Sequence, residues 1–461
     1  MTARAPITDR LAGFIAGFRT DTLPEEVMAY TRTLVSDGLG VLCAATHPDV
    51  TAAQGIGVFA ETVGGAGRAT LIGRGRKTDP VTAALANGTL GYAADFEPHH
   101  PEAILHPVAV MIPTALALCE THGRSGVEAL AAVALGCEVT YRVSMAMNPR
   151  ALYARGFHPS AVAGSFGAAA ASAFLLRLNA EQTARTLGLA ALQTSGLLAW
   201  QDDPREDARP FQMGLAARNG VMSAMLAGQG FGAPDRIFDG GHVVLDAYSE
   251  VAEPARLTDG LGEVWDGVME LAIKPYPCVS FLHPALDALV GLLEGHDLTP
   301  EQIDRISLRF AEAGAHCVDD NPLKGHSAQY ILPVRAAMGR LSFLDLFTDR
   351  RETEREVARL AASAEVIRDT GAFNDAFPDF YMGEVTLTLT DGRRVSATGK
   401  VARGYPEEPL SQAALDAKFA EVTATVCAPD RQAALVRAVT GLHDAPDVTT
   451  LTRLLEPPPD A

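Results

Sequence analysis

The sequence predicts a mainly helical protein, with a large all-helical domain built from both chain ends and a smaller inserted α+β domain. Three observations support this fold class. Residues 8–270 carry apolar side chains mostly at helical spacing, residues 271–404 mix strand-like and helical patterns, and the helical pattern returns from Pro409 to Leu455. We therefore expect a helical domain formed by 1–270 and 405–461, and an α+β domain over 271–404.

The first long helix is expected to begin after Leu23-Pro24, because proline suits the first turn and the following Glu25 and Glu26 complement the helix dipole. Similar apolar patterns predict helices over 81–95, 107–122, 126–147, 160–177, 181–200 and 211–229. Aromatic residues make up only 6% of the chain, and long runs consist of Ala, Gly, Leu and Val. Such small side chains predict helices that pack closely together.

The middle of the chain has a different pattern. Ile303 to Phe310 alternates apolar and polar residues, as a half-buried strand does. The run from Val385 to Thr390, the pair Asp391-Gly392 and the run from Arg393 to Ala397 together predict a β-hairpin. Helical patterns over 284–295 and 327–339 lie between these strands, so this region is expected to be α+β.

Composition and charge exclude several classes of protein. The 461 residues are 48% hydrophobic, which allows a large core, and the net charge of −18 argues against nucleic acid or an anionic membrane as a partner. Six cysteines without a CxxC spacing indicate free thiols in a reducing compartment. Met1–Pro6 shows no leader pattern, and the apolar windows 103–119 and 161–176 fit core helices, so we expect a cytoplasmic protein.

One short segment concentrates titratable side chains. It contains Asp95, Glu97, His99, His100 and His106, directly before an apolar run. Imidazole and carboxylate groups side by side are what proton transfer requires, because one group accepts a proton while another orients or donates. A metal-dependent hydrolase that uses Asp95, His99, His100 and His106 is the alternative, although Asp-x3-His and His-x6-His match no closed zinc pattern. We predict acid–base catalysis and no metal.

Four further positions carry chemistry. His158 follows Gly156-Phe157 and precedes a long Ala/Gly helix, whose N-terminus would attract an anion. Arg209 and Lys274 are single cations beside prolines in apolar surroundings, and both are plausible clamps for a carboxylate. Tyr330 follows His326-Ser327 at the start of a helix in the smaller domain, where it is either a core residue or a phenol on a lid.

These segments, in this order, resemble the MmgE/PrpD family, which includes 2-methylcitrate dehydratases, cis-aconitate decarboxylases and iminodisuccinate epimerases. The resemblance spans most of the chain, and each motif alone is weak. The residues that carry it are Ala86-Asn87-Gly88, Asp95-Phe96-Glu97, His106-Pro107, Gly156-Phe157-His158-Pro159, Gly214 to Gly220, Gly230 to Pro234 and Ile273 to Cys278.

The resemblance implies a helical domain with an inserted α+β lid, a homodimer, a cleft between the domains and no required cofactor. Carried over by position, it implies a site at Asp95, His106, His158, Lys274 and Tyr330. The expected activity is a lyase or isomerase that removes an α-proton from a small di- or tricarboxylate. We expect a hydro-lyase similar to 2-methylcitrate dehydratase, with the family's epimerase and decarboxylase reactions as alternatives.

Two positions depart from the family pattern. His99 stands where the family has a small hydroxyl residue, and Arg209 stands where it commonly has lysine. A guanidinium binds carboxylates but is a poor proton donor. We therefore assign His99, Arg209 and Lys274 to substrate binding, and Asp95, His106, His158 and Tyr330 to catalysis. A relative that binds a ligand without turnover is a third possibility.

Overall fold

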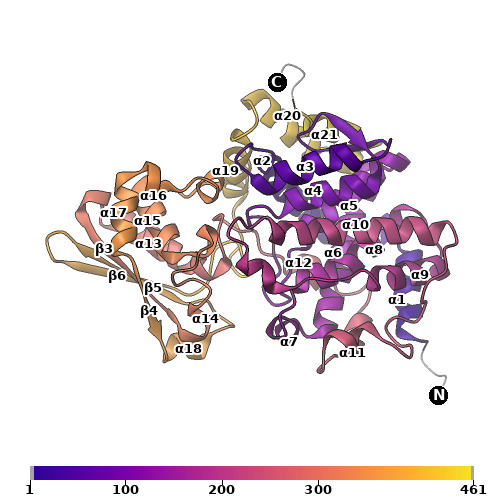
Figure 1. Cartoon of the computed structure of the whole chain (residues 1–461), viewed down its shortest axis with the longest axis horizontal. Helices are drawn as coiled ribbons and strands as arrows, with labels where there is room; N and C mark the ends of the chain where they lie inside the picture. The colour runs from indigo at the N-terminus through magenta and orange to yellow at the C-terminus, as the bar shows by residue number, and fades with distance from the viewer. Residues whose placement is uncertain (1–4, 458–461) are drawn as a thin grey trace. The chain divides into compact units, whose positions relative to one another are not determined.

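A computed structural model describes residues 5–457 of the chain (Figure 1). Residues 1–4 of the Met1–Pro6 segment, for which no leader was predicted, lie outside the described residues. Contacts divide the chain into two units. The helical unit comprises Met1–Ala93, Glu97–Ala272 and Thr423–Ala461, and the α+β unit comprises Ala94–Phe96 and Ile273–Val422. The first expected boundary, at residue 271, lies next to the change of unit at Ile273. The second was expected after residue 404, and the later change of unit follows Val422.

The helical unit consists of helices and one two-stranded hairpin, β1 (Ala69–Leu71) with β2 (Arg76–Thr78). Its N-terminal and central helices are α1 (Ile7–Gly17), α2 (Glu25–Ala44), α3 (Thr51–Val63), α4 (Pro80–Gly91), α5 (Pro107–His122), α6 (Gly126–Met147), α7 (Pro149–Ala154), α8 (Pro159–Leu175), α9 (Ala180–Ala191), α10 (Ala208–Gly228), α11 (Val244–Tyr248) and α12 (Asp266–Met269). Two C-terminal helices, α20 (Pro429–Thr440) and α21 (Thr449–Leu454), complete the unit. The N-terminal helices α1–α3 and the C-terminal helices α20 and α21 thus belong to one unit (Figure 1).

Local signals explain where the central helices begin and end. Pro107 opens α5, and Gly123 closes it in the left-handed conformation at φ 61°. A capping box between Ser125 and Glu128 begins α6 two residues later. The predicted ranges 107–122 and 126–147 are therefore confirmed to the residue.

Small residues allow α4, α8 and α10 to approach one another closely. A Cβ added at Gly88 of α4 would lie 2.9 Å from the Cα of Gly214 on α10. A Cβ at Gly220 of α10 would lie 2.4 Å from the backbone and side chain of Ala168 on α8. Both distances are shorter than real contacts allow, so the predicted close packing depends on glycine at these two positions.

Helix α6 is long and apolar enough to cross a membrane by length and composition alone. However, 89% of its most apolar window is buried inside the protein, so α6 is a core helix of the helical unit.

The α+β unit has a four-stranded sheet in the order β4-β3-β5-β6. β3 (Ile303–Ala311) pairs antiparallel with β5 (Gly383–Leu389), and β5 pairs antiparallel with β6 (Arg394–Gly399). The edge strand β4 (Glu365–Asp369) runs parallel to β3. The helices of this unit are α13 (His283–Gly295), α14 (Glu312–Ala315), α15 (Ala328–Met338), α16 (Arg350–Thr353), α17 (Arg355–Ser363), α18 (Ala372–Ala376) and α19 (Gln412–Ala424), which runs into the helical unit at its end.

Helix α13 packs against the β5–β6 hairpin, and two glycines of the hairpin allow the close approach. A Cβ at Gly383 would lie 2.9 Å from Cβ of Ala285, and one at Gly399 would lie 1.9 Å from the carbonyl oxygen of Pro284. The core of this unit gathers apolar residues from α13, α15 and the sheet, among them Leu286, Ile331, Leu308 and Val385.

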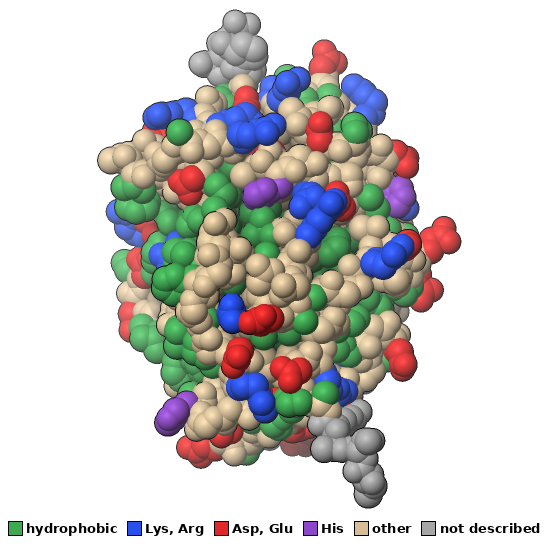
Figure 2. All heavy atoms as spheres, turned by 90° about the vertical axis from the view of Figure 1, so that its right-hand side faces the viewer, with side chains coloured by type: hydrophobic (Ala, Val, Ile, Leu, Met, Phe, Trp, Pro, Cys, Tyr) green, Lys and Arg blue, Asp and Glu red, His purple; other side chains and the backbone are tan. Residues whose placement is uncertain are grey.

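The mainly helical fold class is confirmed, with helices dominating the described residues and one small sheet in the inserted region. The predicted strand at Ile303–Phe310 and the hairpin at 385–397 are present as β3, β5 and β6. The sequence analysis missed β4, whose residues are mostly exposed or half-buried and show no clear alternation. On one face of the molecule, acidic, basic and hydrophobic side chains are interspersed despite the net charge of −18 (Figure 2).

Candidate functional site

The predicted residues fall into two groups, one in each unit. His99, His106, His158 and Arg209 belong to the helical unit, and Asp95, Lys274 and Tyr330 belong to the α+β unit.

His106 and His158 occupy equivalent places in the helical unit. Each is the residue immediately before a proline that opens a helix, α5 in one case and α8 in the other. Because the first N–H groups of a helix carry partial positive charge, two such helix starts favour a negatively charged ligand. The backbone N–H of His106 donates to Oγ of Ser160 in the first turn of α8, at 3.0 Å, and so ties the two helix starts together.

Glu97 orients the ring of His106. Its Oε1 lies 2.7 Å from Nδ1 of His106, and its side chain is fully buried. An ionised carboxylate can only accept a hydrogen bond, so Nδ1 carries the hydrogen and the lone pair of the neutral ring lies on Nε2. The side chain of His106 retains 13% exposure, so the ring is not sealed in the core.

Gln212 orients the ring of His158 in the same way. Its Oε1 lies 3.2 Å from Nδ1 of His158, and its Nε2 donates to the carbonyl oxygen of Leu197 at 2.8 Å. The bond to Leu197 fixes which end of the amide is oxygen, so Nδ1 of His158 must donate to it. Both histidines are therefore held in the tautomer that has its lone pair on Nε2.

Tyr92 lies at the centre of this cluster. Its ring centroid is 4.6 Å from that of His106 and 5.9 Å from that of His158. The guanidinium carbon of Arg209 lies 4.8 Å from the Tyr92 ring centroid and 5.6 Å from the centroid of Trp200. Stacking on two aromatic rings holds a planar cation in a fixed orientation.

Arg209 is buried, and it pairs with Glu206 at 3.1 Å. A buried guanidinium requires a counter-charge, and Glu206 supplies one from the turn before α10. A guanidinium binds carboxylates in a two-pronged geometry, so Arg209 is chemically suited to recognise a carboxylate.

His99 and His100 point to different neighbours. The ring of His99 lies 5.8 Å from that of His106, nearly parallel to it, and the His99 backbone pairs with Ala272. The ring of His100 instead stacks on Tyr141 at 4.7 Å. Burial lowers the pKa of His100 to about 4, so this ring is neutral at physiological pH.

Asp95 and Lys274 form a buried ion pair in the α+β unit. Nζ of Lys274 donates to Oδ1 of Asp95 at 2.6 Å and to its backbone oxygen at 2.8 Å. Asp95 adopts a left-handed backbone conformation, at φ 51°. Lys418 on α19 donates to the carbonyl oxygen of Phe96 at 2.9 Å, so two lysines hold residues 94–96 in this unit.

His283 lies in the electrostatic field of this pair. Burial, followed by the positive charge of Lys274, lowers the pKa of His283 to about 3. Burial also raises the pKa of the Cys278 thiol, which feels both Lys274 and Asp95. The ion pair therefore has neutral neighbours at these two positions.

Tyr330 is bound within the core of the α+β unit. Its hydroxyl donates to the carbonyl oxygens of Asp345 and Thr348, at 2.5 and 3.0 Å, and accepts from the backbone N–H of Arg350. Burial raises its pKa to about 12. These bonds give Tyr330 a structural function, and its catalytic role on a lid stays a prediction.

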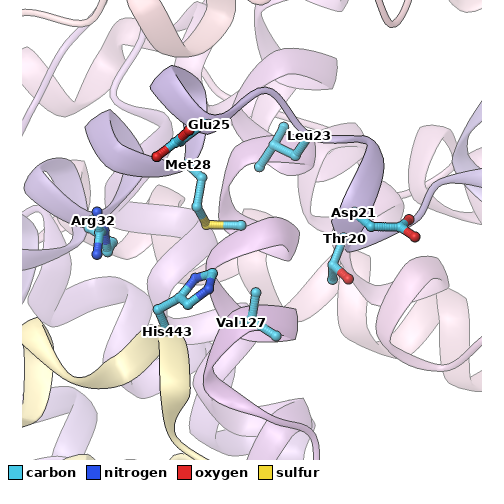
Figure 3. A pocket seen from close by; sticks show the side chains of 8 residues that line it. All are labelled: Thr20, Asp21, Leu23, Glu25, Met28, Arg32, Val127 and His443. Atoms are coloured by element: carbon cyan, nitrogen blue, oxygen red, sulfur yellow. The ribbon is translucent and has the colours of Figure 1, made fainter.

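Two of the four residues of the metal-dependent alternative, His99 and His100, belong to no candidate metal-binding group of three or more closely placed ligands in the described part of the chain. A cavity of about 540 Å³ elsewhere in the helical unit is lined by Thr20, Asp21, Leu23, Glu25, Met28, Arg32, Val127 and His443 (Figure 3). None of the predicted site residues lines this cavity.

The sequence analysis assigned no role to Tyr92, Glu97, Trp200, Glu206 or Gln212. Glu97 could have been found, since it lies in the Asp95–His106 segment where an imidazole needs an orienting carboxylate. Lys418 and Gln212 gave no signal, because their partners lie far away in the sequence.

The chain is similar to several known proteins along most of its length. The chain is 26% identical to a cis-aconitate decarboxylase-like protein of Aspergillus oryzae, over 98% of both chains. It is 25% identical to the cis-aconitate decarboxylase of Aspergillus terreus, over 99% of this chain and 97% of the relative. It is also 25% identical to the mouse (Mus musculus) cis-aconitate decarboxylase, over 98% of this chain and 94% of the relative.

Two domain families match successive parts of the chain. The MmgE/PrpD N-terminal domain matches residues 9–257, and the MmgE/PrpD C-terminal domain matches residues 276–444. Both matches agree with the resemblance carried by the motifs. The chain belongs to the MmgE/PrpD family, whose members include lyases.

Proposed function

We propose that the protein is a cofactor-independent lyase that acts on a small di- or tricarboxylate by proton transfer at a carbon next to a carboxylate. The observation that carries this proposal is the pair of histidines around Tyr92, each held by a hydrogen bond at Nδ1. Both rings keep Nε2 for proton exchange, so one imidazole in its neutral form can remove a proton while the other, in its protonated form, delivers one.

Arg209 supplies the recognition of the substrate. Its guanidinium, fixed on Tyr92 and Trp200, binds one substrate carboxylate, and the starts of α5 and α8 favour the same negative charge. When a proton leaves the neighbouring carbon, negative charge spreads onto that carboxylate, and the fixed cation stabilises it. The roles predicted for Asp95, His99, Lys274 and Tyr330 remain part of the proposal.

The relatives support decarboxylation of a tricarboxylate as the reaction to test first, because their names describe that activity. In that reaction the C–C bond breaks, carbon dioxide leaves, and an imidazolium protonates the carbon that keeps the electron pair. Dehydration, the reaction first expected, requires one histidine to remove the α-proton and the other to protonate the leaving hydroxyl. Epimerisation requires proton removal and delivery on opposite faces of one carbon.

A substrate panel tests the proposal. Purified protein treated with a chelator would be incubated with cis-aconitate, 2-methylcitrate, citrate and iminodisuccinate, and proton NMR would follow the products. Turnover of any one compound without added metal supports the lyase or epimerase and identifies the reaction. Turnover only after metal is added back would favour the hydrolase alternative, and thermal stabilisation by a carboxylate without turnover would favour a binding protein.

We further propose that the enzyme is a cytoplasmic homodimer without a nucleic-acid or membrane partner. The six cysteines are all free thiols, which supports a reducing compartment. Light scattering of the purified protein measures the mass in solution, and a monomeric mass would contradict the dimer.

A further inference from the structure

Two cysteines from opposite ends of the chain meet in the helical unit. Sγ of Cys43, near the end of α2, lies 3.6 Å from Sγ of Cys427, which lies between α19 and α20. The two residues are 384 positions apart in the sequence. Both sulfurs therefore need only a small movement to reach the length of a disulfide bond, about 2.05 Å.

The two thiols differ in access and in charge. Cys43 is 5% exposed, whereas Cys427 is only half-buried. The hydrogen bond from Cys43, together with the positive charge of Arg431, lowers the pKa of Cys427 to about 7. The pKa of Cys43 is raised, first by its hydrogen bond to Cys427 and then by burial. Cys427 is thus the thiol that reacts, because the thiolate is the nucleophile.

We propose that Cys43 and Cys427 are a peroxide-sensitive pair that closes into a reversible disulfide. The Cys427 thiolate attacks one oxygen of a peroxide, the O–O bond breaks, and Cys427 becomes a sulfenic acid as hydroxide leaves. The Cys43 sulfur then attacks the sulfenic sulfur, and the S–O bond breaks. The released hydroxide groups take up the two thiol protons, so each peroxide yields one disulfide and two waters. A small dithiol reverses the reaction by exchange.

The bond would join α2 to the segment in which the chain returns to the helical unit. The unit changes at Thr423, four residues before Cys427. A covalent link there closes a loop that contains most of the chain, and such links restrict the unfolded state. The oxidised protein should therefore unfold at a higher temperature than the reduced protein.

The test compares Cys427 with Cys317, which is also half-buried but contacts the ring of His316 rather than another thiol. Burial raises the pKa of Cys317 to about 11. Fully reduced protein would be treated with an equimolar amount of hydrogen peroxide. Free thiols would then be alkylated, and the peptides mapped by mass spectrometry without reduction. Cys43→Ala, Cys427→Ser and, as the control, Cys317→Ser would be treated alike.

The wild type and Cys317→Ser should lose two alkylated thiols and yield one peptide pair joining Cys43 to Cys427, which dithiothreitol separates. In Cys43→Ala, dimedone should trap a lasting sulfenic acid on Cys427. If Cys43→Ala fails to fold, alkylation of the wild type replaces it, with Cys427 expected to react at least about tenfold faster than Cys317 at neutral pH. Equal alkylation rates, or peroxide treatment that leaves Cys43 and Cys427 unjoined, would overturn the proposal.

Discussion

The two groups of predicted residues hold their charges in different ways. In the helical unit, imidazole rings and one guanidinium lie around Tyr92, and Nδ1 of each of His106 and His158 has an orienting hydrogen-bond partner. In the α+β unit, Lys274 makes two hydrogen bonds to Asp95, and its side chain is only 1% exposed. The imidazole rings of the first group can gain and lose a proton, whereas a proton lost from Lys274 would leave the buried Asp95 carboxylate without its cation.

This difference suggests that the histidines suit proton transfer, whereas the Asp95–Lys274 pair provides fixed charges. A group that exchanges protons in every cycle needs an open nitrogen and a firm orientation, and His106 and His158 meet the second condition through Glu97 and Gln212. A buried ion pair with close hydrogen bonds resists such exchange because either neutral form leaves an unpaired charge. We therefore place proton transfer chiefly on the histidines, and the following changes would break or sharpen that assignment.

Replacing His106 should have the largest effect on activity. In His106→Asn the amide can still donate to Glu97, but the Nε2 lone pair is lost, so kcat should fall by about 10²–10⁴-fold. Steady-state kinetics on the substrate found in the panel measures the change. His100→Gln is the matched control, since His100 belongs to the same segment but stacks on Tyr141. A variant at position 106 with kcat close to that of the control would remove His106 from the scheme.

Replacing Lys274 should have the largest effect on stability. Lys274→Met leaves the Asp95 carboxylate buried without its cation, and the free energy of unfolding should fall by about 3–5 kcal/mol. Chemical denaturation measures this loss. The double variant Asp95→Asn/Lys274→Met should recover most of it, because asparagine is neutral and tolerates the left-handed conformation. A single variant as stable as the wild type would show that the pair is not a fixed element.

Glu97→Gln tests the orientation of His106 without removing a catalytic nitrogen. The amide keeps the size of the side chain but can present a donor to Nδ1, which allows the wrong tautomer. We expect kcat to fall by about 10–100-fold, with KM little changed and an altered pH profile. Glu102→Gln, at an exposed position nearby, serves as the control. An unchanged pH profile would mean that Glu97 only packs against the ring.

Arg209→Lys tests substrate recognition. Lysine keeps the charge but loses the planar stacking on Tyr92 and Trp200 and the two-pronged grip on a carboxylate. KM should rise by about tenfold because the grip on the carboxylate is lost, and kcat should fall as well because the fixed cation also stabilises the charge that develops in the transition state. Arg205→Lys, at an exposed position, should have no effect. A variant with wild-type KM and kcat would remove Arg209 from both roles.

The buried His100 should make stability depend on pH. Its pKa is about 4 in the folded protein and 6.5 when unperturbed, so the unfolded state takes up a proton first as the pH falls. The contribution of neutral His100 to the free energy of unfolding is complete above pH 6.5 and is lost as the pH falls toward 4. Between about pH 7.5 and pH 5.5 the wild type should lose about 1 kcal/mol more than His100→Gln. Parallel curves for the two proteins in denaturant titrations would contradict this assignment.

The sequence predicted most helices and the main strands, because their signals are local. Pro107 and the Ser125–Glu128 box mark helix starts within a few residues, and Asp391-Gly392 marks the hairpin between β5 and β6. β4 was missed because its residues lie at the edge of the sheet, where burial leaves little pattern.

The site was predictable only as a set of reactive side chains. Motifs along the chain predicted His99, His106, His158 and Arg209 as site residues. In the fold, His106, His158 and Arg209 lie around Tyr92, and His99 lies beside His106. Gln212 was not identified because its partner His158 lies 54 positions away in the sequence, whereas Glu97 lies only 9 positions from His106 and could have been identified from the sequence. The hydroxyl of Tyr330 bonds to the backbone of its own unit, and the catalytic role predicted for this residue stays a prediction.

The most direct test of proton transfer by the histidines is isotope exchange in deuterium oxide, followed by proton NMR in the presence of a chelator. The wild type should exchange the α-proton of at least one carboxylate of the panel, or turn it over with deuterium incorporated into the product. The His106→Asn/His158→Asn variant, folded as judged by circular dichroism, should do neither. Exchange at the wild-type rate in that variant, or wild-type activity that requires added metal, would contradict the account.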